Sequence, residues 1–68
     1  MQSGIVKFYS DLQGIGFITP NSGGPEIFVN ASALEKSGLS SLEKGQKVRF
    51  DLSEGRRAQL AASNLRLA

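Results

Sequence analysis

The sequence contains no cysteine and no histidine, and these absences remove most residue types that carry metal and acid–base chemistry. Without cysteine, the chain can form neither a disulfide framework nor a thiolate metal site. Histidine is the commonest general base and the commonest metal ligand, so its absence argues against an enzyme. Six acidic residues remain, but they fall in expected turns or on polar strand faces. We therefore expect a protein that is not an enzyme and that uses no cofactor or metal.

Long apolar segments are also missing, as is a strong excess of charge of one sign. No apolar run approaches the roughly 20 residues that span a bilayer. The N-terminus lacks the basic-then-apolar pattern of a secretory signal. We expect a cytoplasmic protein with no membrane partner. Eight Lys and Arg against six Asp and Glu give a net charge of +2, which permits a polyanionic partner without requiring one.

Prolines are few, whereas glycines are frequent and divide the chain into short segments. The 68 residues are enough for one small domain, expected over residues 1–68, with little room for a deep cleft. Turn residues cluster at 10–14, 20–25 and 54–57. The expected strands between these breaks are 4–9, 14–19, 26–30, 46–52 and 59–65. Short strands at this spacing predict an all-β barrel or sandwich.

Residues 31–44 do not follow the alternation of a strand. Ser32 is placed to cap one helical turn over residues 32–36 that ends at Gly38. Residues 40–45 repeat this pattern on a smaller scale. We expect a long connection with a short helical turn, which crosses from the first three strands to the last two.

The expected strand at 46–52 alternates between apolar and charged side chains. This pattern is typical of an antiparallel strand with one face in the core and one in solvent. The core face consists of Val48, Phe50 and Leu52, and the other face consists of Lys47, Arg49 and Asp51. Lys47 and Arg49 could contact phosphate, but charged residues are also expected there simply because this face of the strand is exposed to solvent.

Two phenylalanines lie where core packing alone would not put them. Ile27 and Val29 take the core face of their strand, which leaves Phe28 outward, and Ile18 leaves Phe17 outward in the same way. A ring flanked by glycine on a strand is open to a stacking base. Two such strands side by side would make the stacking platform of a sequence-tolerant single-strand binder. The alternative interpretation is that Phe17, Phe28 or both pack in the core.

The order of these segments resembles that of a bacterial cold-shock domain protein. The similarity runs through GIVKFYS at 4–10, GIGFITP at 14–20, IFVN at 27–30, SAL at 32–34 and LEKGQKV at 42–48. It covers nearly the whole chain and includes both ribonucleoprotein-type motifs. The resemblance implies a five-stranded antiparallel OB-fold barrel whose first three strands bind single-stranded RNA or DNA. It also implies an RNA chaperone or a regulator of transcription or translation.

The resemblance carries a set of nucleic-acid-binding residues onto this chain. Phe17 and Phe28 are expected to stack on bases, with Phe8 extending the platform. Lys7 and two arginines of the last turn are expected to contact phosphate, although a solvated turn also explains the arginines. The full set is Lys7, Phe8, Gln13, Ile15, Phe17, Phe28, Asn30, Arg56 and Arg57.

Departures from the family pattern fall on the binding face. The family usually has phenylalanine where this chain has Ile15 and Ala31, histidine at Asn30, lysine at Gln13 and tryptophan at Phe8. Stacking is worth roughly 1–3 kcal/mol per base, so two lost rings would weaken binding by about 2–6 kcal/mol if additive. We therefore expect reduced affinity for a single strand.

A protein-interaction module on the same barrel face stays open as the second interpretation. Its surface would consist of Phe8, Ile15, Phe17, Phe28 and Leu39. A partner or a second copy would cover this mostly apolar patch, and the aliphatic replacements of rings favour this interpretation. We expect a monomer or weak dimer whose partner is single-stranded RNA or DNA and not a small-molecule substrate.

Overall fold

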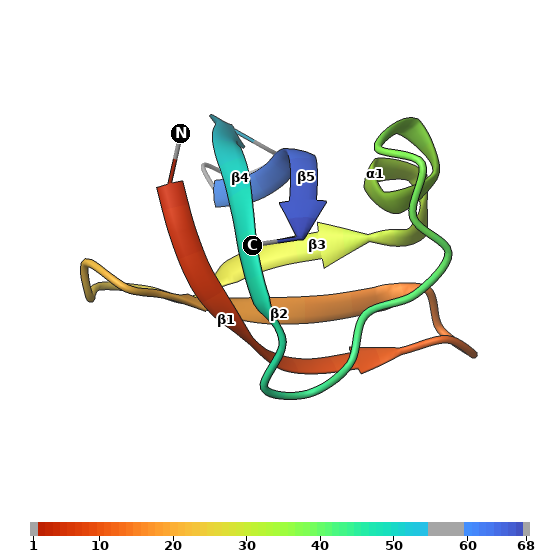
Figure 1. Ribbon diagram of the computed structural model, residues 1–68, viewed down its shortest axis with the longest axis horizontal. Coiled ribbons are helices and arrows are strands. Elements are labelled where there is room, and N and C mark those ends of the chain that lie inside the picture. The colour runs from red at the N-terminus through yellow and green to blue at the C-terminus, as the bar shows by residue number, and fades with distance from the viewer. Residues whose placement is uncertain (1, 55–59, 68) are drawn as a thin grey trace.

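The computed structural model describes residues 2–54 and 60–67, and these residues form a closed barrel (Figure 1). Its strands are β1 (Gln2–Ser10), β2 (Ile15–Pro20), β3 (Ile27–Asn30), β4 (Lys47–Glu54) and β5 (Leu60–Leu67). The order around the barrel is β1-β2-β3-β5-β4, with antiparallel neighbours except β3 and β5, which are parallel. The five-stranded OB-type barrel is therefore confirmed, and the sandwich is not. Strand ends differ from expectation by one or two residues.

The barrel interior is filled by alternate side chains of the strands together with two residues of the long connection. The buried hydrophobic residues are Val6, Ile18, Ile27, Val29, Leu34, Leu42, Val48, Phe50, Ala62 and Leu65. The core positions expected for Val48 and Phe50 are confirmed, but Leu52 is 41% exposed. The register shift between Arg49 and Asp51 puts its extra residue on β5, so β4 keeps its alternation. Leu52 lies near the end of β4, where it lines an open hollow together with Phe50 and Leu60.

The connection from β3 to β4 contains helix α1 (Ala31–Lys36). Its N-cap is Asn30, whose Oδ1 accepts a hydrogen bond from the Ala33 amide at 2.9 Å. The expectation that Ser32 caps the helix is wrong, because the chain turns helical one residue after Asn30 and Ser32 already lies in the first turn. Gly38 ends the helix as expected, with φ of +77°.

The second helical turn, expected at 40–45, does not form. The structure describes all of these residues, and they contain a tight turn in which the Gln46 amide donates to the Glu43 carbonyl at 3.1 Å. Leu42 is buried in the core and fixes the connection across the end of the barrel. The crossing from the first three strands to the last two is confirmed (Figure 1).

Candidate nucleic-acid interface

A bulge in β1 turns Phe8 outward. Val6 pairs with Ile18 and Phe8 pairs with Phe17, so Lys7 is an extra residue on β1. Residues two apart on a regular strand share a face, and Val6 is in the core, so an unbroken strand would bury Phe8. The extra residue reverses the alternation and leaves Phe8 41% exposed.

The cross-strand register brings three rings together on the outer face of β1, β2 and β3. Phe8 lies opposite Phe17, and Phe17 lies opposite Phe28. The ring centroids are 5.6 Å apart for the first pair and 5.9 Å apart for the second, with interplanar angles of 46° and 69°. Rings at these distances and angles stabilise one another through edge contacts. We call Phe8, Phe17 and Phe28 the aromatic row.

Gly16 allows β1 and β2 to approach closely beside the aromatic row. A Cβ at Gly16 would lie 2.5 Å from the Phe8 carbonyl oxygen and 2.8 Å from Cδ1 of Tyr9. Any side chain there would push the two strands apart. The glycine is therefore required by backbone packing, and the exposure of Phe17 follows from the register that it permits.

Tyr9 faces the other way from Phe8 and packs against the core. Partial burial raises the pKa of its hydroxyl, and the carboxylates of Asp11 and Glu35 raise the pKa further. The hydroxyl therefore stays protonated at neutral pH and can both donate and accept a hydrogen bond.

Ile15 and Asn30 lie opposite each other on β2 and β3, two residues along each strand from Phe17 and Phe28 and therefore beside the aromatic row. Ile15 shares the outer face of β2 with Phe17 but has no π-face. The Asn30 Oδ1 already accepts the hydrogen bond of the helix cap, which leaves its amide nitrogen and one oxygen lone pair for other partners. Gln13 lies exposed in the turn between β1 and β2, where its backbone amide donates to Ser10 Oγ at 3.3 Å.

Lys7 protrudes from the bulge beside the aromatic row and forms an ion pair. Its Nζ lies 2.6 Å from Oε2 of Glu26, and both side chains remain partly exposed. The carboxylate of Glu26 therefore competes with phosphate for this charge, a constraint that the sequence pattern did not reveal. The other two expected phosphate contacts, Arg56 and Arg57, lie outside the described residues.

Leu39 does not join the aromatic row, because it is partly buried and packs against the core. Leu12 is the opposite case, since it is fully exposed in the turn between β1 and β2. Residues 2–54 and 60–67 contain no cluster of acidic side chains that could hold a metal ion. No helix in this part of the chain is long and apolar enough to cross a membrane.

A closed OB-type barrel with aromatic side chains on one outer face is an architecture found among proteins that bind oligonucleotides. The sequence model of the family described as 'Cold-shock' DNA-binding domain matches residues 2–67, so the chain belongs to the cold-shock domain family, whose function is nucleic-acid binding.

Curated relatives match along most or all of their length. Cold shock protein CspA of Rhizobium meliloti (strain 1021) is 44% identical over 69 residues and 100% of both chains. Cold shock protein CapA of Pseudomonas fragi is 45% identical over 60 residues, which cover 88% of this chain and 94% of the relative. Cold shock-like protein CspE of Escherichia coli (strain K12) is 38% identical over 64 residues, or 94% and 93% of the two chains.

Proposed function

We propose that the protein binds single-stranded RNA or DNA through the aromatic row and acts as an RNA chaperone of low affinity. The observation that carries this proposal is the cross-strand alignment of Phe8, Phe17 and Phe28 on one outer face. Every base has a π-face, so a row of rings accepts unpaired bases with little sequence preference. Bases held in this way are withdrawn from pairing, which opposes secondary structure without consuming ATP.

Low affinity follows from what surrounds the row. Ile15 and Ala31 offer no ring, and the Lys7 charge is shared with Glu26. Two missing stacking contacts correspond to about 2–6 kcal/mol, an upper range because neighbouring contacts are coupled. The remaining phosphate contacts would come from Lys7, Arg56 and Arg57. We also propose that Gln13 and the amide nitrogen of Asn30 contact bases or backbone beside the row.

The test is fluorescence anisotropy with a labelled pyrimidine-rich oligonucleotide and with the duplex of the same sequence. We expect tighter binding to the single strand, and we expect Phe28→Ala to weaken that binding by about 5- to 150-fold, the range of one stacking contact. Equal binding of strand and duplex would contradict the proposal.

Self-association through the same face is the second candidate function. The observation that favours it is the exposure of apolar side chains near the row, with Ile5 at 40%, Phe8 at 41% and Leu12 at 100%. Sedimentation of the free protein over a concentration series separates the two candidates. Association that is lost with Leu12→Ser, together with no oligonucleotide binding, would favour the second.

A further inference from the structure

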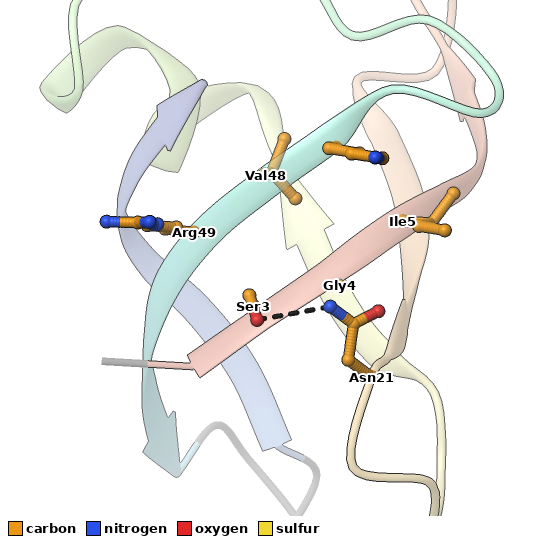
Figure 2. A pocket seen from close by; sticks show the side chains of 7 residues that line it. Ser3, Gly4, Ile5, Asn21, Val48 and Arg49 are labelled. Atoms are coloured by element: carbon orange, nitrogen blue, oxygen red, sulfur yellow. Dashed lines mark hydrogen bonds between the residues drawn. The ribbon is translucent and has the colours of Figure 1, made fainter. Parts of the chain in front are cut away.

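A second surface with a different chemistry lies farther along the same barrel wall. An open hollow of about 410 Å³ between the start of β1 and β4 is lined by Ser3, Ile5, Asn21, Lys47 and Arg49, among others. Figure 2 shows Asn21 reaching across to Ser3 at its edge, where the Asn21 amide nitrogen donates to Ser3 Oγ at 3.1 Å. Hydrogen-bonding groups and cations therefore line the same depression.

The strand register arranges the outer residues in successive rows around the barrel. Beyond the aromatic row, Ile5 on β1 lies opposite both Thr19 on β2 and Lys47 on β4. In the next row, Arg49 on β4 lies opposite both Ser3 on β1 and Arg66 on β5. We call Lys47, Arg49 and Arg66 the cationic patch.

Among the side chains that the structure describes, no carboxylate forms an ion pair with the cationic patch. Arg49 and Arg66 are direct cross-strand neighbours, and like charges in that position destabilise a sheet. No ion pair joins Lys47, Arg49 or Arg66 to another residue whose side chain the structure describes. The next acidic residue along β4, Asp51, accepts a hydrogen bond from the Asn64 amide nitrogen at 3.0 Å. An anionic partner would relieve the repulsion between the arginines.

The aromatic row and the cationic patch are close enough for one strand to contact both. On β2, Thr19 is two residues from Phe17, and it lies opposite Ile5 on β1. On β1, Ser3 is two residues farther in the same direction. At about 3.3 Å per residue in the strand direction, the row of Lys47 lies roughly 7 Å and the row of Arg49 roughly 13 Å from the aromatic row. Between them the outer side chains on β1 and β2 are Thr19, Ile5 and the bulged Lys7, whose charge is paired with the Glu26 carboxylate.

We infer that the cationic patch is a phosphate-binding extension of the interface, occupied by the backbone of a single strand that leaves the aromatic row past β1. This inference rests on the proposed function. The patch carries no rings, so it contacts phosphates and adds affinity without base preference. A strand must be long enough to span both surfaces before the patch contributes.

The test compares two labelled oligothymidines, one of about 5 nucleotides and one of about 16, the two ends of the range of OB-fold site sizes. The variant combines Lys47→Gln with Arg49→Gln. The matched control combines Lys36→Gln with Lys44→Gln, which removes the same charge from exposed positions elsewhere. Binding is measured by anisotropy over a salt series, and circular dichroism verifies that each variant is folded.

For the longer strand we expect the variant to lower the salt slope by about 1.4, since each single-strand phosphate contact contributes about 0.7. A tenfold rise in salt would then weaken the unmodified protein by about 25-fold more than the variant. The shorter strand should bind variant and control equally. Arg66→Gln alone should lower the slope for the longer strand by about 0.7.

An equal loss in variant and control would show that only net charge matters and would overturn the inference. So would an unmodified protein that binds both lengths with the same salt slope, because the strand would then not reach the patch. In both cases the proposed function still holds if the protein binds the shorter strand and Phe28→Ala weakens that binding. If the unmodified protein binds neither strand, the proposed function and the inference both fail.

Discussion

The aromatic row lies on β1, β2 and β3 and the cationic patch on β4 and β5 of the same barrel, yet the two surfaces differ in every chemical respect. The row consists of three uncharged rings in mutual contact, whereas the patch consists of cations in which two arginines lie opposite each other. Stacking is insensitive to salt, while phosphate contacts weaken as salt rises. We therefore expect that mutations in the aromatic row change the affinity for a single strand, whereas mutations in the cationic patch change its salt dependence.

The largest effect is expected from removing two rings of the aromatic row. Phe17→Ala with Phe28→Ala should weaken binding of a short single strand by about 2–6 kcal/mol, or about 30-fold to 10⁴-fold, because two stacking contacts are lost. Anisotropy measures the change.

The matched control for the double variant removes apolar bulk outside the row. Leu52→Ala with Leu67→Ala truncates two side chains that are exposed on β4 and β5. This control should bind the short strand as the unmodified protein does. If the ring variant also binds normally, the aromatic row is not the site.

The next largest effect is a gain. Ile15→Phe should add a ring beside the aromatic row and tighten binding by about 1–3 kcal/mol, or about 5- to 150-fold. Ile15→Leu provides the control, since it changes the shape of the side chain without adding a π-face. Equal affinities for the two variants would show that the missing ring does not limit binding.

A smaller effect concerns the fold beside the row. Asn30→Ala should lower the free energy of unfolding by about 0.5–2 kcal/mol, because the Ala33 amide loses its capping acceptor. Ser32→Ala, in the first turn of α1, should leave stability nearly unchanged. Urea unfolding monitored by circular dichroism compares the two variants, and a larger loss for Ser32→Ala would contradict the assignment of the cap.

The smallest effect is expected at the ion pair beside the row. Glu26→Gln should release Lys7 for phosphate and raise the salt slope for a short strand by up to about 0.7. Stability should change by less than about 1 kcal/mol, since exposed ion pairs contribute little. The double variant Glu26→Gln with Lys7→Gln should not show this increase in salt slope. If it does, the added phosphate contact is not made by Lys7.

The sequence predicted the strands and the outward position of two of the three rings correctly, because side chains that alternate along a strand point alternately into the core and out of it. Phe17 and Phe28 could be placed outward from Ile18, Ile27 and Val29 alone, and the structure confirms this placement. The same reasoning cannot place Phe8. Its outward position depends on the bulge at Lys7, and a bulge adds one residue to a strand without changing its composition.

Other features could not be predicted because they depend on contacts between distant residues. Lys7 meets Glu26 only after β1 and β3 have both paired with β2, so their ion pair leaves no local signal. Asn30 and Ser32 are both good capping residues, and only the end of β3 decides between them. Leu52 follows the strand pattern, but it lines an open hollow near the end of β4, and alternation does not show where along a strand the core ends.

The central claim is that rings and not charge supply most of the affinity for a short single strand. A salt series with a labelled oligothymidine of about 5 nucleotides tests it most directly, comparing the unmodified protein with the variant that carries Phe17→Ala and Phe28→Ala. We predict parallel lines of log affinity against log salt, with the variant lower by about 1.5 to 4 decades at every salt concentration. Lines that coincide at high salt would contradict the claim, because the affinity would then be electrostatic.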